Sequence, residues 1–437
     1  MKWVWRIGLF LVGAAALALR VRHLDVGPEP EEGWFYAMAR GLGTGLDRFT
    51  PAPPALGHLL ERPLFFLAYL PASWIGGLAA CRAQAALVSA LLAPAVALAA
   101  RRFGVAWPLA LGAGALIAVE EVGTRFAARL LPGPLAMLLA LVGIALVLGR
   151  ERPRLGWVLL AAATLVDHLS LLAPLAASLL VPTPRRYALL SLAPAALLTL
   201  IAVVAGAHAD PLWAVPGFGA RVFQAGFLDL AFVPLLALAA VLGRGLFAFA
   251  LGPAAILVAR HLLADRGAEL WQGAVLVPCG VLLIAAAAQA LFVELPRWRG
   301  ALHGRAVVAV GFAAAFGWSF LSESSTAGLR GLPVRFSLYW ATTHVGPDPG
   351  RPAFLWTARE KPDHLIVAGC PWGWAIHPLG RRAGRVTFIA EAGGYELDTP
   401  ADALVYCDLS PFQTPRPDCP WQRAGRFVYV DPKDCPR

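Results

Sequence analysis

Three carboxylates stand close together in the polar stretch that follows the first apolar segment. They are Glu29, Glu31 and Glu32. A carboxylate near a membrane surface can act as a general base, because it accepts the proton of a reacting hydroxyl. The same pattern also suits the start of a surface helix, where Pro30 and early glutamates are favoured. Taken alone, the spacing favours this second, structural interpretation.

His58 and Glu61 add two possible metal ligands to the same polar stretch. Together with Glu31 or Glu32 they could hold a divalent metal ion, which takes carboxylate oxygens as ligands. The spacing does not require such a site. A divalent metal is therefore a candidate cofactor, and no other cofactor is indicated.

Two further polar pairs interrupt apolar sequence. Asp167-His168 lies between two short apolar segments, and Glu120-Glu121 ends another one. Charged groups at membrane depth are costly and usually functional, whereas the same groups at the tip of a hairpin are simply solvated. Both interpretations stay open for Asp167-His168. We interpret Glu120-Glu121 as a solvated helix end.

The elements that must position these residues are membrane helices. The chain has 437 residues, of which 58% are hydrophobic and only 15% are charged, against about 25% charged in soluble domains. The apolar residues form blocks of about twenty, the length that crosses a bilayer as a helix. The net charge of +10 comes from arginines spread singly or in pairs between these blocks, so we expect no nucleic-acid partner.

We predict about eleven membrane segments and interpret the first as an uncleaved helix rather than a signal peptide. The fifth and sixth are short and can be half-crossings of a hairpin. Arginines on alternate loops place the N-terminus in the cytoplasm and the C-terminus outside. Residue usage suggests a bacterium, and hence the cytoplasmic (inner) membrane. The segments span approximately 4–20, 83–100, 107–122, 130–148, 155–166, 168–182, 187–207, 227–243, 245–261, 271–293 and 305–321.

The chain divides into two predicted domains. Residues 1–321 form the transmembrane domain, which includes the first outer loop at 21–62 and an interfacial helix at 63–80. Residues 322–437 form a small extracytoplasmic domain, either α/β or mostly β, because short β-prone runs alternate with turn residues there. The expected strands are HLIVAGC, RVTFIA, DALVYC and GRFVYV.

Four of the six cysteines lie in this second domain, at Cys370, Cys407, Cys419 and Cys435. Disulfides are plausible outside the cytoplasmic membrane. Three pairings are possible, and Cys407–Cys419 would close a short proline-rich loop. A zinc site is the less favoured alternative because no CxxC pair is present. Cys81 and Cys279 are expected to be ordinary buried thiols.

The first outer loop resembles the Asp-Glu signature of the GT-C glycosyltransferases, such as protein mannosyltransferases and the aminoarabinose transferases of lipid A. Glu31-Glu32 occupies the position of the acidic pair in this signature. Phe35 occupies the position of its aromatic residue, and Ala39-Arg40 that of its Ala-Arg dipeptide. His58 precedes Pro63-Leu64-Phe65-Phe66, and Arg82 opens the second helix in an Ala-x-Arg arrangement. The pair is Glu-Glu here, and the His-Pro segment is longer than the family pattern.

The resemblance implies a membrane glycosyltransferase of the cell envelope. Its donor would be a polyprenyl-phosphate sugar, and its acceptor a lipid, glycan or protein at the outer face of the bilayer. Glu31 or Glu32 would be the base of an inverting transfer. Arginines suit the leaving phosphate: Arg125 and Arg129 would share a helical face, with Arg221 and Arg260 behind them. The candidates for binding the donor and its lipid phosphate are Arg125, Arg129, His58, Glu61, Asp167, His168, Arg221 and Arg260.

Each of these assignments has a competing explanation. Arg125 and Arg129 could merely extend to lipid phosphates. The whole protein could be a transporter or flippase of lipid-linked substrates, which predicts internal repeats that we do not find. It could also be a non-catalytic membrane scaffold, which predicts that Glu31 and Glu32 face bulk solvent.

Overall fold

The computed structural model divides the chain into two compact units. The helical unit comprises Met1–His23, Leu60–Phe65 and Ala83–His344, and the sheet unit comprises Leu24–Leu59, Phe66–Arg82 and Val345–Arg437. The predicted domain boundary at residue 321 stays a prediction. The structure describes residues 2–24, 32, 35–36, 39, 49–50, 62–120, 123–124, 126–150, 152–181, 186–204, 246, 248–250, 252–253, 255, 273–289, 364–368, 385–389, 403–407, 420, 422–424 and 427–430.

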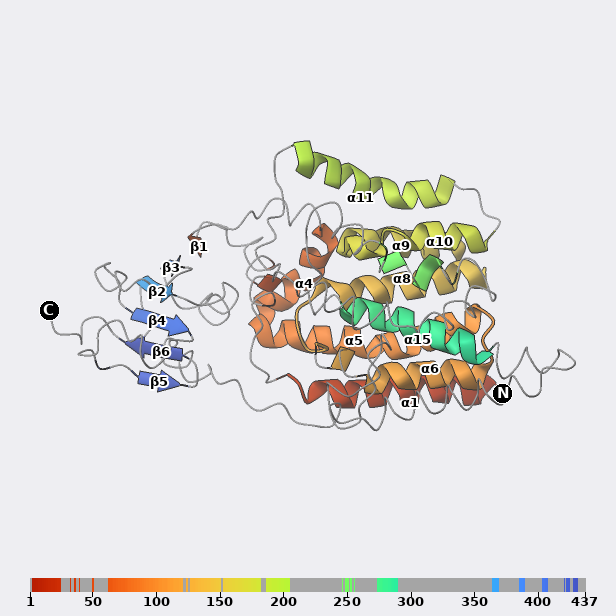
Figure 1. Cartoon of the computed structure of the whole chain (residues 1–437), viewed down its shortest axis with the longest axis horizontal. Helices are drawn as coiled ribbons and strands as arrows, with labels where there is room; N and C mark the ends of the chain where they lie inside the picture. The colour runs from red at the N-terminus through yellow and green to blue at the C-terminus, as the bar shows by residue number, and fades with distance from the viewer. Residues whose placement is uncertain are drawn as a thin grey trace, which may run out of the picture. The chain divides into compact units, whose positions relative to one another are not determined.

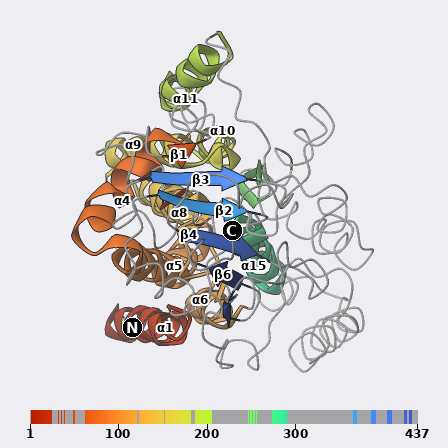
Figure 2. The ribbon, with the colours of Figure 1, turned by 90° about the vertical axis from the view of Figure 1, so that its left-hand side faces the viewer.

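Helices that lie side by side make up the helical unit (Figures 1 and 2). A proline in the first turn of α6, α8 and α9 marks where each of these helices begins, since proline suits that position. The described helices of the chain are α1 (Lys2–Val21), α4 (Pro63–Ile75), α5 (Gly77–Arg102), α6 (Trp107–Val119), α8 (Pro132–Gly149), α9 (Pro153–Val166), η2 (His168–Ser170), α10 (Ala173–Leu180), α11 (Arg186–Val204) and α15 (Gly273–Gln289). Of these, most of α4 and the start of α5 belong to the sheet unit, which contains Phe66–Arg82.

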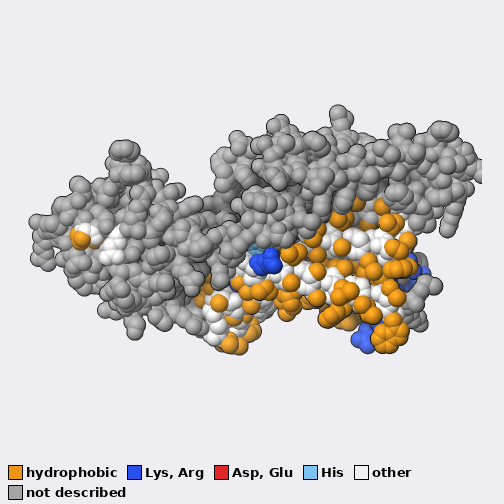
Figure 3. All heavy atoms as spheres, turned by 90° about the horizontal axis from the view of Figure 1, so that it is seen from below, with side chains coloured by type: hydrophobic (Ala, Val, Ile, Leu, Met, Phe, Trp, Pro, Cys, Tyr) orange, Lys and Arg blue, Asp and Glu red, His pale blue; other side chains and the backbone are white. Residues whose placement is uncertain are grey.

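Three of the described helices are long and apolar enough to cross a membrane. They are Trp3–Val21, Gly77–Arg102 and Pro132–Gly149. Large apolar side chains such as Trp3, Phe10 and Leu11 of α1 are exposed. Hydrophobic side chains cover the described part of the face in Figure 3, with lysines or arginines in small patches. This surface suits contact with lipid.

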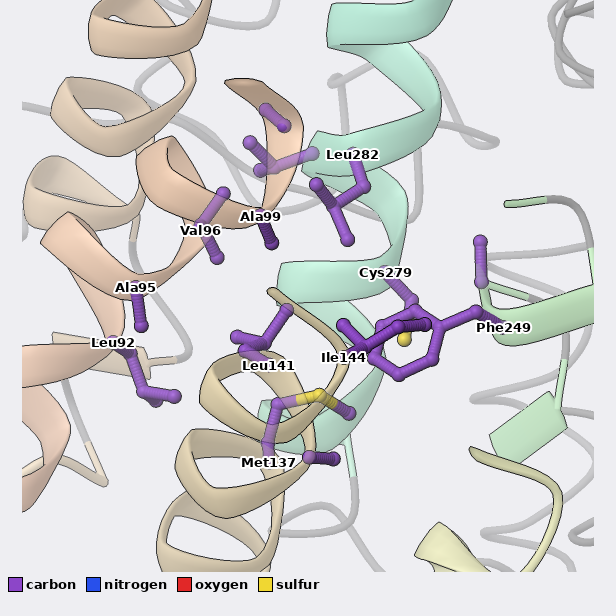
Figure 4. Packing of buried hydrophobic residues seen from close by; sticks show 14 of the residues in the cluster. Leu92, Ala95, Val96, Ala99, Met137, Leu141, Ile144, Phe249, Cys279 and Leu282 are labelled. Atoms are coloured by element: carbon purple, nitrogen blue, oxygen red, sulfur yellow. The ribbon is translucent and has the colours of Figure 1, made fainter. Parts of the chain in front are cut away.

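Small residues allow the helices to pack closely. Apolar side chains of α5, α8 and α15, among them Val96, Leu141 and Leu282, meet in a common core (Figure 4). At the contact of α8 with α9, an added Cβ on Gly156 would lie 2.7 Å from the carbonyl oxygen of Gly143. Close approach through small residues is a common way for membrane helices to associate.

A sharp turn separates α4 from α5. Gly77 begins α5 with a φ of 65°, a value that residues with a Cβ rarely adopt. The apolar run predicted over 63–80 therefore ends as a helix at Ile75, and α5 begins six residues before the predicted 83. As a result Arg82 lies in the second turn of α5, rather than at its opening as expected.

A six-stranded mixed sheet belongs to the sheet unit, in the order β1-β3-β2-β4-β6-β5 (Figure 1). The first four of these strands are parallel, and β6 pairs antiparallel with both β4 and β5. The edge strand β1 comes from the first outer loop and aligns Phe49 with Val386 and Thr50 with Thr387. The strands are β1 (Phe49–Thr50), β2 (His364–Ala368), β3 (Arg385–Ile389), β4 (Ala403–Cys407), β5 (Gln422–Ala424) and β6 (Phe427–Val430).

The four predicted strands are confirmed as β2, β3, β4 and β6, whereas β1 and β5 were not predicted. Eight predicted membrane segments coincide with described helices, although in 168–182 the α-helix begins only at Ala173, after η2. Segments 227–243 and 305–321, and most of 245–261, lie outside the described residues. The number of spans, their orientation and the class of the C-terminal domain stay predictions.

The contact between α8 and α9 can be tested with alanine substitutions. Gly156→Ala should lower the free energy of unfolding by about 1–3 kcal/mol, because the new methyl group meets backbone atoms. Gly112→Ala in α6 is the matched control, since an added Cβ there meets nothing within 4 Å, and alanine favours a helix over glycine. Denaturant titration of the purified protein in detergent measures both. Equal effects of the two changes would contradict the close packing.

Candidate functional site

The acidic pair of the first outer loop begins a buried helical face. Glu32, Phe35, Tyr36 and Ala39 are helical, and each is at most 3% exposed. Their spacing of three, four and seven residues places them on one side of a helix. The ring of Phe35 lies 6.2 Å from that of Phe66 in α4. A helix near the acidic pair, as the sequence suggested, is therefore present at these residues, but the face that carries Glu32 is buried and not on the surface.

The carboxylate of Glu32 is held by a single arginine. Arg82 Nε donates to Glu32 Oε1 at 2.8 Å, and Arg82 Nη2 donates to Glu32 Oε2 at 2.7 Å. Glu32 is fully buried, and the Arg82 side chain is 8% exposed. This bidentate arrangement is the strongest geometry for an arginine–carboxylate pair. Removing one partner of such a buried pair typically costs about 3–5 kcal/mol.

The same guanidinium also reaches the beginning of the loop. Arg82 Nη1 donates to the backbone oxygen of Leu24 at 2.9 Å. Arg82 thus contacts two points of the chain, Leu24 and Glu32. Glu31, the other member of the acidic pair, lies outside the described residues.

In the helical unit, Arg20 is a buried arginine that the sequence did not single out. It is 1% exposed, and its Nε donates to Ser89 Oγ of α5 at 2.9 Å. Its other nitrogens donate to the carbonyl oxygens of Ala16, Ala118 and Ile117, the last at 2.9 Å. Carbonyl groups in the last turn of a helix have no hydrogen-bond partner within the helix. Arg20 therefore supplies hydrogen bonds to two carbonyl groups at the C-terminal end of α6. In the sequence, Arg20 resembles the arginines that commonly flank a membrane helix.

Glu120 is buried, and the prediction of a solvated helix end is wrong for it. It is fully shielded from solvent. Its carboxylate accepts a hydrogen bond from Gly123 N, and its backbone oxygen accepts from Thr124 Oγ. A side-chain oxygen three residues before an amide is a typical helix cap. Glu121 lies outside the described residues.

Arg129 does not lie on the helical face that was predicted for it. Residues 126–129 form a turn between α6 and α8. Arg129 is 6% exposed, and its guanidinium lies 5.9 Å from the ring centre of Phe126. Because this side chain is buried, the competing explanation that it extends to lipid phosphates does not fit. Arg125 lies outside the described residues.

Asp167 and His168 lie where α9 ends. Asp167 is fully buried, so the alternative of a solvated hairpin tip is wrong for it. Its Oδ1 accepts from Leu169 N at 3.3 Å and lies 3.3 Å from His168 Nδ1. The His168 side chain is 21% exposed. The aspartate caps η2, and a partly accessible imidazole stands beside it.

The remaining candidates cannot be placed. Within the described ranges no group of three metal-binding side chains occurs, and the metal site of His58 and Glu61 stays a prediction. Cys81 and Cys279 are buried free thiols, as expected. Cys407 is described only as the last backbone position of β4. The candidates that lie outside the described residues are Glu31, His58, Glu61, Arg125, Arg221, Arg260, Cys370, Cys419 and Cys435.

Two solved structures resemble the chain along its whole length. ArnT from Cupriavidus metallidurans in the apo state has a TM-score of 0.60 at 16% identity, covering 100% of this chain and 99% of that chain. The same protein bound to undecaprenyl phosphate has a TM-score of 0.55 at 15% identity, covering 99% of this chain and 98% of that chain. No protein-family model and no curated protein matches the sequence.

At this level of identity the likeness shows the fold. ArnT is a GT-C enzyme, so the GT-C fold that the acidic pair and its neighbours suggested is confirmed. With its long apolar helices, the chain is a multi-pass membrane protein. Activity does not follow from fold alone.

The role of Arg20 can be tested against an exposed arginine. Arg20→Ala should lower the free energy of unfolding by at least about 2 kcal/mol, because it removes buried charge-assisted hydrogen bonds. Arg154→Ala is the control, since Arg154 is exposed, and it should change stability by less than about 0.5 kcal/mol. Both are measured by denaturant titration in detergent. Similar losses in the two variants would rule out a specific role for Arg20.

Proposed function

We propose that this protein is a glycosyltransferase of the bacterial cytoplasmic membrane. It transfers a sugar from a polyprenyl-phosphate donor to a lipid, glycan or protein acceptor at the outer face. The observation that carries the proposal is the buried, bidentate ion pair of Glu32 and Arg82. It lies at the acidic signature of a chain with the GT-C fold.

The solved structures support the choice of donor. One of them is bound to undecaprenyl phosphate, a polyprenyl phosphate. A leaving phosphate needs cations, and arginine matches phosphate oxygens with two parallel hydrogen bonds. The buried Arg129 is the described candidate for this task, and Arg125 is its proposed partner. Asp167 and His168 are proposed to help bind the donor.

The two glutamates then have different tasks. Both oxygens of Glu32 accept hydrogen bonds from Arg82, which leaves Glu31 as the proposed general base. Glu31 takes the proton of the acceptor hydroxyl while that oxygen bonds to the anomeric carbon. The bond from this carbon to the phosphate oxygen breaks, and the polyprenyl phosphate leaves with the electron pair. Attack from the opposite side inverts the configuration.

The buried pair also weighs against a non-catalytic scaffold. That alternative predicts an acidic pair in bulk solvent, but Glu32 is fully buried. The transporter alternative predicts paired broken helices in two related halves. Neither explains why the acidic signature is tied to an arginine fifty residues along the chain.

Sugar transfer in membranes tests the proposal. Glu31→Gln keeps the size of the side chain but removes its basicity, so kcat should fall about 10²–10⁴-fold. Glu29→Gln is the matched control, because it removes a neighbouring carboxylate outside the acidic pair and should stay near wild-type activity. The assay follows labelled sugar leaving polyprenyl phosphate. Undiminished transfer by Glu31→Gln would exclude Glu31 as the base.

A further inference from the structure

Arg20 fixes the end of the helix that precedes Arg129. Its guanidinium donates to the carbonyl oxygens of Ile117 at 2.9 Å and Ala118 at 3.3 Å, in the last turn of α6. We infer that Arg20 is a positioning residue: it holds the connector between α6 and α8 (described at residues 120, 123–124 and 126–129), and this connector presents Arg129 to the donor phosphate. The inference rests on the proposed function and adds to it a residue that acts through Arg129.

The polar ends of α6 need partners inside the protein. Its 13 residues make a helix about 20 Å long, which is shorter than the roughly 30 Å of hydrocarbon in a bilayer, and lipid tails offer no hydrogen bonds. At the N-terminal end, Gln289 Oε1 of α15 accepts from Ala106 N at 2.9 Å. At the C-terminal end, Arg20 supplies the donors. Separate side chains therefore bind the two ends of α6, and each can be changed alone.

Arg20 also ties this end of α6 to two other helices. Its Nε donates to Ser89 Oγ of α5 at 2.9 Å, and its Nη1 donates to Ala16 O of α1 at 3.1 Å. The residue is 1% exposed, so water competes little for these bonds. Because the nitrogens of a guanidinium lie in one plane at fixed angles, the contacts set the orientation of the end of α6. A lysine at this position would supply only a point charge.

Hydrogen bonds carry this position along the connector to Arg129. Glu120 follows the last residue of α6, and its backbone oxygen accepts from Thr124 N at 3.0 Å and from Thr124 Oγ1. Thr124 O in turn accepts from Ala127 N at 3.3 Å. Phe126 O accepts from Arg129 N at 3.1 Å, and the guanidinium of Arg129 lies 5.9 Å from the centre of the Phe126 ring. Short local bonds thus link the position of Arg129 to the end of α6.

A purely structural role is the competing explanation for Arg20. Both explanations predict that Arg20→Ala lowers the free energy of unfolding. They differ in donor binding, because only a positioning role makes the loss of Arg20 act through Arg129. Gln289→Ala is the matched control: it removes a buried hydrogen bond at the opposite end of α6 and leaves the contacts of Arg20 in place.

Binding of undecaprenyl phosphate to the full chain in detergent separates the two explanations. We expect Arg129→Gln and Arg20→Ala each to weaken this binding about tenfold or more, the effect of losing a hydrogen bond to a charged group. The double variant should bind no more weakly than Arg129→Gln, because the two residues act as a unit. Arg20→Lys should recover only part of the loss, and Gln289→Ala should bind like wild type.

A milder variant keeps the test decisive if Arg20→Ala does not fold. Thr124→Val removes the hydroxyl that donates to Glu120 within the connector, and it should weaken binding about threefold. Binding equal to wild type in Arg20→Ala, or in Thr124→Val where Arg20→Ala does not fold, would overturn the inference. Equal weakening in Arg20→Ala and Gln289→Ala would also overturn it, since loss of stability alone would then explain both.

Hydrogen exchange tests the hold on the connector without any ligand. The amides of Thr124, Ala127 and Arg129 should exchange at least about tenfold faster in Arg20→Ala than in wild type, and at the wild-type rate in Gln289→Ala. Unchanged exchange in Arg20→Ala would overturn the inference even if binding is lost. A wild type that binds no undecaprenyl phosphate would instead refute the proposed donor, and faster exchange would then still establish that Arg20 holds the connector.

Discussion

The described structure depends on how charged side chains are accommodated inside an apolar protein. A charged side chain at membrane depth is expensive unless hydrogen bonds or an opposite charge compensate it. Several buried charges of the described residues are compensated in this way. Glu32 pairs with Arg82, and Arg20 binds carbonyl oxygens at the end of α6. Glu120 and Asp167 accept from backbone amides just beyond their own positions. Arg20 lies in the last turn of α1, and Glu120 and Asp167 follow the last residues of α6 and α9, so these three buried charges lie at helix ends.

Features that depend on local pattern were predictable from the sequence. Apolar blocks located α1, α6, α8 and α15 to within a few residues, because burial in lipid or in a helical core requires a continuous apolar stretch. Short β-prone runs located β2, β3, β4 and β6. The two-residue β1 was not predictable, since a strand of that length has no periodicity and forms only by pairing with β3, more than 300 residues later.

The environment of the charged residues was harder to predict, because it depends on distant parts of the chain. Glu120 looked like a solvated helix end, yet it is fully buried. Glu32 and Arg82 were each noted in the sequence, yet nothing in it joined them, because fifty residues separate them. Arg20 matched the ordinary charge that flanks a membrane helix. The sequence therefore indicates which residue types could do chemistry, and tertiary contacts decide which of them are already occupied.

The adjacent glutamates show how such contacts could divide one motif into two tasks. Two ionised carboxylates side by side repel each other, and both would repel the anionic phosphate of the proposed donor. Arg82 compensates the charge of Glu32, so the acidic pair together with Arg82 carries about one net negative charge instead of two. One carboxylate can then serve as an anchor without adding to the repulsion, while its neighbour keeps the basicity that proton transfer requires. On this argument the two acids of the motif differ in charge environment, because Arg82 compensates only Glu32 in the described contacts.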